Sequence, residues 1–347
     1  MSATAQAKPD ERRVLIPTRI APPPFPAALR TLVVRELGGE TMGTSWSARL
    51  AIPPGSDLTP LKRGIEAVLA RVIDEMSPWQ PGSPISRFTA ASADTWHRLP
   101  DGFFKVLSAA IDWAGRTGGA YDPTIGAAVN LWGFGPDPSR DTIPDRRAID
   151  RARERGGWQR LELDRATRSA RQPGGVLLDL SSIAKGFAVD EVARHLRSQG
   201  IDNLLVEIGG ELRGEGSKPD GTPWWIALEQ PRGARHADTL PETLLALAGL
   251  SVATSGDERR YFDAAGRRYA HTLDPATGAP VTHDLVSVTV CAEDCMTADA
   301  AATALTVLGP DRGPAFAAAH RLAARFVRLS DARLTEHLSP EMAAMLD

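Results

Sequence analysis

Apolar residues recur at helical spacing along several stretches of the chain. The clearest stretch runs from Leu58 to Met76, where apolar side chains return every three or four residues after the start signal of Thr59 and Pro60. An alanine-rich stretch near the C-terminus ends at Gly309 and Pro310. We therefore predict helices at Leu58–Met76, Phe103–Ala114, Ile149–Arg155 and Thr297–Leu308.

Short runs of apolar residues between glycines and prolines predict strands. The stretch Thr31–Ile52 is expected to form two strands joined by a glycine-containing turn, with Met42 at the start of the second. Arg259–Asp263 and Arg267–Leu273 are expected to form a hairpin around Gly266. Further strands are predicted at Trp158–Leu163, Ala170–Leu178, Asn203–Ile208, Trp224–Leu228 and Leu285–Ala292.

The stretch Leu177–Asp190 predicts a strand that leads into a helix. A short apolar run is followed by Asp179, by a serine pair in cap positions and by an amphipathic pattern that ends near Gln199. The first N–H groups of a helix have no partner within it and attract anions. Lys185 has the wrong charge for this end of the helix dipole, so it either neutralises a bound acidic group or is an ordinary surface lysine.

Two loops concentrate aromatic and turn-forming residues. Trp79 stands between prolines, and the stretch Gly118–Gly135 places Tyr121 and Asp122 in a loop before a short helix that Pro123 can start. Aromatic side chains beside anion-binding loops suit a planar ligand, although core packing is the commoner use of tryptophan.

Asp299 and Thr303 are four residues apart on the predicted alanine-rich helix, so their oxygens project from one face. Two hard oxygen donors on a thin face suit Mg²⁺, which takes few protein ligands and completes its shell with water and substrate phosphate. The same residues also fit a structural reading, with Asp299 favoured by the helix dipole and Thr303 bonded to its own helix.

The composition excludes some classes of function. With 347 residues and 42% hydrophobic content, the chain can form one large domain or two smaller ones. A net charge of −3 gives no electrostatic case for a nucleic-acid partner, and no apolar run has the length of an integral membrane segment. P-loop, GxGxxG and HExxH motifs are missing from the sequence. The two cysteines, Cys291 and Cys295, predict buried reduced thiols.

The N-terminus combines Arg12 and Arg13 with a short apolar run, as a twin-arginine export signal does, but prolines and a further arginine interrupt the pattern. We therefore interpret residues 1–32 as a flexible, proline-rich leader and residues 33–347 as the folded domain. The expected location is cytoplasmic, and a periplasmic one stays open.

Taken together, the motifs of this chain resemble the ApbE family of FAD:protein FMN transferases. They occur in the family's order and cover nearly everything from about residue 35 to about residue 310. The carrying motifs are MGT at 42–44, SPWQPGSPISRF at 77–88, YDPTIGAAVNLWGFG at 121–135, LDLSSIAKGFAVD at 178–190, VEIGGELR at 206–213, ATSGDERRYF at 253–262, HTLDPATGAPV at 271–281 and TADAAAT at 297–303.

The resemblance implies a single α+β domain of mixed sheets and helices that encloses a flavin cleft. It also implies Mg²⁺-dependent transfer of the FMN half of FAD to a threonine hydroxyl in a motif of an acceptor flavoprotein, with release of AMP. The positions that would surround FAD are Met42, Trp79, Ala120, Tyr121, Asp122, Asp179, Lys185 and Leu273. The positions that would bind Mg²⁺ are Ser182, Asp299 and Thr303.

This chain departs from the family pattern in two places within these motifs. Where Ser182 stands, relatives often use a backbone carbonyl on the metal, so either that carbonyl or the hydroxyl can serve here. Pro84 stands where many relatives have glutamate, and it should stiffen its loop.

Pyrophosphate cleavage needs positive charge near the phosphate and a base for the attacking hydroxyl. We assign the first role to Lys185 together with Mg²⁺ and the second to His271, which titrates near neutral pH. Two alternatives stay open. One is an FAD pyrophosphatase, in which water replaces the protein hydroxyl, and it would use the same residues. The other is an FAD-binding protein without catalysis, which would be marked by loss of Lys185, Asp299 or Thr303, all of which this chain keeps.

Overall fold

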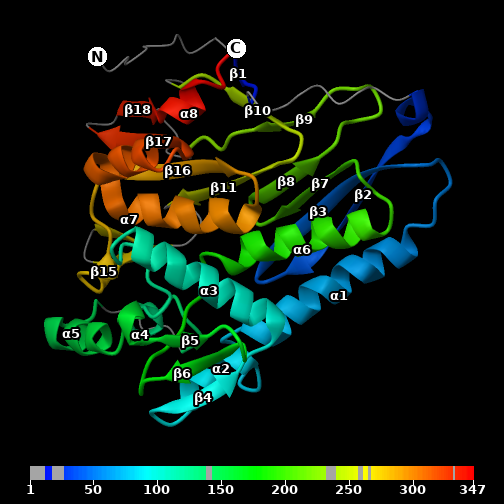
Figure 1. Cartoon of the computed structure of the whole chain (residues 1–347). Helices are drawn as coiled ribbons and strands as arrows, with labels where there is room; N and C mark the ends of the chain where they lie inside the picture. The colour runs from blue at the N-terminus through cyan, green and yellow to red at the C-terminus, as the bar shows by residue number, and fades with distance from the viewer. Residues whose placement is uncertain are drawn as a thin grey trace. The chain divides into compact units, whose positions relative to one another are not determined.

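The computed structural model describes residues 12–17, 27–137, 143–231, 240–256, 261–264, 267–330 and 333–347. Within these ranges the chain forms two compact units, each assembled from separate stretches of sequence. Helices and largely antiparallel sheets are mixed along the chain (Figure 1), which confirms the predicted α+β fold class. The first unit takes residues up to Leu69, Lys185–Gly256 and Asp284–Asp347, and the second takes Ala70–Ala184 and Asp257–His283.

The first unit is built on an eight-stranded sheet in which every neighbouring pair is antiparallel. The order across the sheet is β18-β17-β16-β11-β8-β7-β3-β2, so strands from the two ends of the chain form the two edges. The strands are β2 (Val33–Thr41), β3 (Thr44–Ile52), β7 (Leu204–Ile208), β8 (Glu211–Glu215), β11 (Leu250–Gly256), β16 (Leu285–Ala292), β17 (Ala323–Ser330) and β18 (Arg333–Leu338).

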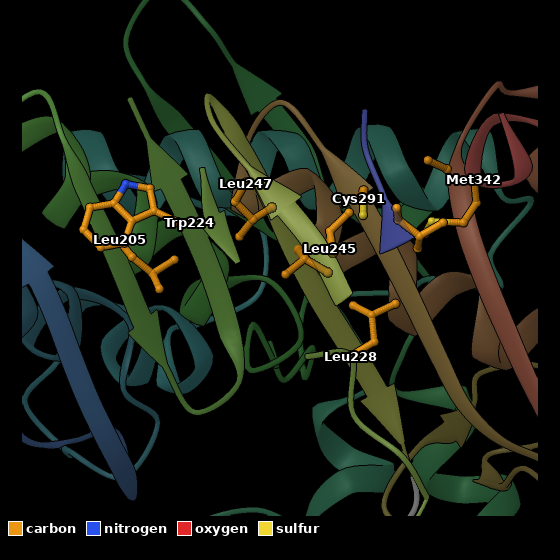
Figure 2. Close-up of a cluster of buried hydrophobic side chains, with 10 residues drawn as sticks. Leu205, Trp224, Leu228, Leu245, Leu247, Cys291 and Met342 are labelled. Carbon is orange, nitrogen blue, oxygen red and sulfur yellow. The ribbon is translucent and has the colours of Figure 1, made fainter. Parts of the chain in front are cut away.

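A second, three-stranded sheet packs on one face of the large sheet. It contains β1 (Arg13–Leu15), β10 (Thr243–Leu247) and β9 (Trp224–Ala227), in the order β1-β10-β9. Its apolar side chains share a buried cluster with the large sheet, and Figure 2 shows Trp224 beside Leu205 and Leu245 beside Cys291. The cluster also explains why Cys291 is a buried free thiol, as predicted; Cys295 is buried and free as well.

Two helices, α6 (Ala184–Ser198) and α7 (Cys295–Ala319), lie along the other face of the large sheet (Figure 1). Side chains of a strand alternate between faces, so Ala253 and Val290 are buried on this side. The predicted stop at Gly309 is a break within α7, where the glycine has a φ of 76°. Pro310 then begins a further helical stretch that the sequence did not predict. The short elements η1 (Ala27–Thr31) and α8 (Pro340–Ala343) complete this unit.

Regular structure begins before Thr31–Ile52, the first strands predicted from the sequence. Residues of β1 pair in parallel with β10, and the Leu15 side chain is fully buried in the cluster of Figure 2. The Arg13 guanidinium donates to both carboxylate oxygens of Glu336. A short apolar strand with one arginine can therefore be held by the core and an ion pair despite the prolines that follow it. The domain boundary at residue 33 stays a prediction.

The second unit contains small helices and short sheets. Helix α1 (Thr59–Met76), predicted almost to the residue, gives its residues up to Leu69 to the first unit and the rest to the second. The remaining elements are α2 (Pro84–Ala90), β4 (Thr95–Arg98), α3 (Asp101–Arg116), α4 (Gly126–Leu131), α5 (Arg146–Glu154), η2 (Trp158–Arg160), β5 (Glu162–Asp164), β6 (Ser169–Gln172), β12 (Tyr261–Ala264), β13 (Arg267–Ala270), β14 (Leu273–Asp274) and β15 (Ala279–Pro280).

Two predicted strands of this unit are shorter than expected. The strand predicted at Ala170–Leu178 stops at Gln172, because Gly174 and Gly175 have φ values of 99° and 72° that no regular strand adopts. Only a single bridge, Ile125 with Leu177, continues it. The strand predicted at Trp158–Leu163 is instead the 3₁₀ turn η2 followed by β5.

Other predictions for this unit hold with small shifts. Helix α4 begins at Gly126 rather than Pro123, because the Asp122 carboxylate accepts the N–H and hydroxyl of Thr124 and so forms a local turn. Strands β12 and β13 pair as the predicted hairpin, and its turn at Gly266 lies outside the described residues. Over the residues described here, no helix is both long and apolar enough to cross a membrane.

Candidate active site

One end of the eight-stranded sheet carries two tight turns beside each other. Met42 and Gly43 join β2 to β3 with φ values of 49° and 71°, and Gly209 and Gly210 join β7 to β8 with 62° and 103°. Such two-residue turns need positive φ at both positions. A side chain at Gly209 would come within 2.9 Å of Thr44, so the turns pack closely. Methionine in this conformation is strained by about 1–2 kcal/mol, which suits a functional position.

Lys185 is in the first turn of α6, as predicted, and its ammonium pairs with the Glu211 carboxylate at 2.6 Å. Glu211 is the first residue of β8, directly after the Gly209–Gly210 turn, and its side chain is only 3% exposed. The Lys185 side chain is 30% exposed. Because its partner is a buried carboxylate, Lys185 is not an ordinary surface lysine.

Helices α6 and α7 meet at Gly186. A Cβ atom there would overlap the carbonyl oxygen of Cys295 and come within 2.9 Å of the Asp299 Cβ. The Gly186 N–H, one of the donors at the N-terminus of α6, donates to Asp299 Oδ2 at 2.9 Å. Glycine at this position therefore allows one helix to present its N-terminus to a carboxylate of the other.

Asp190 fixes the same two helices one turn further along α6. Its carboxylate oxygens accept the N–H groups of Cys295 and Met296 at 2.9 and 3.0 Å, which caps the start of α7. Arg213 donates to the same carboxylate at 3.2 Å. Burial raises the pKa of Asp190, while these N–H groups and the Arg213 charge oppose the rise. The cap holds the register of α7 against α6.

Asp299 and Thr303 lie on α7, as the sequence predicts. The alternative that Asp299 only complements the helix dipole and that Thr303 only bonds to its own helix is wrong. Asp299 lies beyond the first turn of α7, which begins at Cys295, and its carboxylate serves α6 instead. Within the described part of the chain, the Thr303 hydroxyl forms no hydrogen bond, whereas Thr306 donates to the Ala302 carbonyl at 2.9 Å. The Thr303 oxygen is therefore not occupied by its own helix.

Electrostatics around Asp299 favour a cation. Its side chain is 6% exposed, and burial raises the pKa of the carboxyl, against the Lys185 charge and the Gly186 N–H, which lower it. Oδ1 accepts no hydrogen bond among the described residues. Two carboxylates, Asp299 and Glu211, accompany one ammonium, so the cluster has a formal charge of −1.

In the second unit, two motifs distant in sequence are bound together. The Asp179 N–H donates to the Pro123 carbonyl at 2.8 Å, and the Gly126 N–H donates to the Leu177 carbonyl at 3.1 Å. A Cβ atom at Gly126 would come within 2.8 Å of that carbonyl, which explains the glycine. The loop before α4 and the stretch before α6 are thus adjacent.

The predicted residues Tyr121 and Ser182 join these motifs. The Ser182 hydroxyl donates to Tyr121 Oη at 3.1 Å, and the tyrosine ring is 2% exposed. The sequence suggested that Ser182 caps α6. Its hydroxyl instead bonds to Tyr121 and does not cap the helix. Asp179 accepts the Ser181 N–H at 2.8 Å in a local turn, so it shapes the same segment.

Asp122 organises its loop through both oxygens. Besides the two bonds from Thr124, it accepts the Trp158 N–H at 3.3 Å. Burial raises the pKa of Asp122, and these bonds oppose the rise. Ala120, just before it in the chain, is half-buried. Asp122 is thus a loop-shaping residue, with its carboxylate oxygens engaged by Thr124 and Trp158.

The remaining predicted residues of the second unit differ in exposure. The Leu273 side chain is 5% exposed and packs with Ala128 and Trp132 in an apolar cluster. The half-buried His271 ring makes an edge contact with Phe134, with ring centroids 6.3 Å apart. Trp79, between α1 and α2, is 51% exposed, which is unusual for a large aromatic side chain.

The structure therefore groups Lys185 and Asp299 in the first unit, and Tyr121, Asp179 and Ser182 in the second. Sequence reasoning missed Glu211 as a site residue. The Gly-Gly pair before it was a visible turn signal, but its burial depends on a helix that spacing alone does not place.

Comparison with known proteins identifies the family. The model of the ApbE family matches residues 42–326. An FAD:protein FMN transferase from Vibrio cholerae serotype O1 is 39% identical over 311 residues, which cover 89% of this chain and 92% of that protein. The FAD:protein FMN transferase of Escherichia coli strain K12 is 31% identical over 329 residues, with 93% and 92% covered.

Solved structures show the same relationship. The flavin transferase ApbE from Vibrio cholerae matches with a TM-score of 0.83 and 36% identity, over 90% of this chain and 99% of that one. The apo form of the flavinyl transferase ApbE from Pseudomonas stutzeri matches with a TM-score of 0.82 and 36% identity, over 90% and 97%. The chain belongs to the ApbE family.

Proposed function

We propose that this protein transfers the FMN half of FAD to a threonine hydroxyl of an acceptor flavoprotein and releases AMP. The relatives named above are FAD:protein FMN transferases, which supports both the transfer and FAD as substrate. The observation that carries the chemistry is the cluster of Lys185, Glu211 and Asp299. It places an ammonium beside a carboxylate that still has an oxygen to offer a cation.

Mg²⁺ fits the residues of this cluster. Asp299 Oδ1 and the Thr303 hydroxyl are hard oxygen donors one helical turn apart, and a divalent cation would reverse the formal charge of −1. Among the described residues, no group of three Asp, Glu, His or Cys side chains forms a metal site by itself. A cation here would therefore also use hydroxyl, carbonyl or water oxygens, and Ser182 is the proposed further ligand.

When bound, Mg²⁺ would neutralise charge on the pyrophosphate. The Lys185 ammonium would donate to an oxygen of the FMN-side phosphate and stabilise the charge that develops there. The acceptor threonine oxygen would form a bond to that phosphorus as the bond to the bridging oxygen breaks, and AMP would leave. His271 would take the threonine proton.

Flavin binding is assigned to the aromatic residues and loops. Trp79 leaves half of its surface open, so its face can stack on a planar ring. The strained Met42 turn and the loop at Ala120, Tyr121 and Asp122 are proposed to surround the rest of FAD, and Leu273, whose side chain is in the core, would contribute its backbone. A cytoplasmic location stays a prediction from the sequence.

Intact-mass spectrometry tests the proposal directly. A candidate acceptor with a threonine motif is incubated with the protein, FAD and Mg²⁺, and AMP is followed in the same tube. We expect the acceptor to gain one FMN phosphoryl group with a matching amount of AMP. Free FMN and AMP with an unmodified acceptor would favour the pyrophosphatase, and FAD binding without AMP would favour a binding protein.

The same assay tests the proposed base. His271→Ala should slow transfer by about 10²-fold or more, because general-base catalysis typically contributes that much. Transfer at the wild-type rate would remove His271 from the mechanism.

A further inference from the structure

We propose that Glu211 is a positioning residue that holds the Lys185 ammonium where the transferred phosphate binds. The inference rests on the proposed function, in which Lys185 contacts that phosphate. It adds a residue that the sequence did not single out.

The inference begins from the burial of the Lys185–Glu211 ion pair. The Glu211 side chain is 3% exposed and the Lys185 side chain 30% exposed, with 2.6 Å between Nζ and Oε1. A buried carboxylate keeps its charge only when it is paired and hydrogen-bonded, so Glu211 needs the lysine. The more exposed partner is the lysine, so the open side of the pair presents the ammonium.

The position of Glu211 is fixed by its backbone. Gly209 and Gly210 form the tight turn before it, and Gly209 packs against Thr44 so closely that a side chain there would meet it at 2.9 Å. The Gly209 N–H also donates to the Ser45 carbonyl at 3.1 Å. Glu211 is then the first residue of β8, paired with Ile208 in β7. The backbone that carries this carboxylate is therefore held by a tight turn and by strand pairing.

A fixed partner matters more for lysine than for arginine. The ammonium is a point charge on a flexible four-carbon stem, and ordering it carries an entropic penalty. Glu211 orders the stem before substrate binds. An ammonium has three N–H donors, so the bond to Glu211 does not by itself prevent another bond to a phosphate oxygen.

The pair also acts on Asp299. The Lys185 charge reaches Asp299, whose Oδ2 accepts the N–H of the next residue, Gly186. Moving the lysine would therefore change the charge around the proposed cation ligand as well as around the phosphate. Glu211 thus sets the geometry of both.

A double-mutant cycle tests the inference with two readouts. Glu211→Gln, Lys185→Met and the double variant are compared for FAD affinity, measured by flavin fluorescence without acceptor, and for transfer rate. Each single variant should lose at least about tenfold in transfer, and the double variant should lose no more than Lys185→Met alone. Losses that multiply in the double variant would overturn the inference, as would wild-type transfer by Glu211→Gln.

Thermal unfolding separates positioning from simple stability. Lys185→Met removes the ion-pair partner of a buried carboxylate and should lower Tm, whereas the double variant removes both charges and should recover it. Transfer should not recover with Tm. If transfer and FAD affinity return when stability returns, Glu211 acts only on the fold and the inference is wrong.

Two further variants keep the test informative. Glu211→Asp retains the charge but shortens the side chain, and we expect slower transfer with a smaller loss of Tm than in Lys185→Met; wild-type transfer would contradict positioning. Asp202→Asn makes the same charge change as Glu211→Gln at the opposite end of β7, where the Asp202 side chain is 71% exposed, and should behave as wild type. Transfer by the wild-type protein tests the proposed function separately.

Discussion

Two of the buried ionic clusters described in the first unit are built in opposite ways. Near the termini, two arginines, Arg13 and Arg325, enclose the single carboxylate of Glu336, and Arg325 is fully buried. Between α6 and β8, the two carboxylates of Glu211 and Asp299 accompany a single lysine that is partly exposed. The formal charge is +1 in the first cluster and −1 in the second.

We propose that the first, structural cluster serves the fold and that the second, functional cluster serves the proposed reaction. Burial raises the pKa of Glu336, but hydrogen bonds and charges from Arg13 and Arg325 outweigh it and hold the pKa below its ordinary value. For Asp299 burial prevails, and the pKa is raised. The protein therefore gains stability from ionised Glu336 and loses stability by ionising Asp299. The pKa of Asp190 is also raised by burial, but there the N–H groups of α7 partly compensate the charge; for Asp299 we propose that a bound cation does so.

The largest effect is expected from breaking the structural cluster. Glu336→Ala leaves two buried guanidinium groups without their carboxylate and should lower the free energy of unfolding by about 3–5 kcal/mol. Urea unfolding measures the loss. The matched control is Asp284→Asn, which removes the surface partner of Arg328 and should change stability by about 1 kcal/mol or less.

The direction of the Glu336 pKa shift determines how the stability of the same cluster depends on pH. Because the pKa of Glu336 is lowered, its contribution is present above the ordinary glutamate pKa and is lost as pH falls through the lowered value. The acid loss of stability should therefore be smaller in a folded Glu336→Gln variant than in wild type.

The next effect concerns the functional cluster. Asp299→Asn should reduce Mg²⁺-dependent transfer by about 10²-fold or more, because it removes the charge of a proposed metal ligand. Stability at pH 7 should stay equal or rise, since the buried charge is removed. If Asp299→Asn loses stability and keeps its transfer rate, the Asp299 cluster serves the fold and not the reaction.

The smallest effect is expected at the contact between α6 and α7. Gly186→Ala should lower stability by about 1–3 kcal/mol, because its methyl group meets the backbone of Cys295. It should also weaken Mg²⁺ dependence, since the Gly186 N–H shifts away from Asp299. The control Gly64→Ala also adds a methyl group within a helix, but there it meets only the movable ring of His195 and should be tolerated.

The sequence predicted what depends on local pattern. Helices α1 and α3 follow from apolar periodicity, and the break at Gly309 follows from a Gly-Pro pair. Lys185 was indicated by the predicted helix start within residues 177–190, and Asp299 by its spacing to Thr303 on one helix. Each of these signals lies within one continuous stretch of chain.

What depends on distant stretches could not be predicted. The burial of Leu15 requires β10, and the ion pair of Glu211 requires Lys185 in α6; neither contact leaves a local signal. The bond between Tyr121 and Ser182 likewise joins two loops that sequence treats as separate. Residues whose role lies in holding another residue were the ones missed.

The strand order of the large sheet has a consequence for synthesis of the chain. The hairpin of β2 and β3 is made early, but β3 pairs on its other side with β7, where Trp46 meets Ile208 about 160 residues later. At roughly 5–20 residues per second, a ribosome needs about 10–30 s to deliver that partner. During this interval the hairpin exposes an open edge and the apolar side chains of Trp46, Ala48 and Leu50, which are buried in the finished protein. Early binding by a chaperone would therefore protect this hairpin more than any later segment of the sheet.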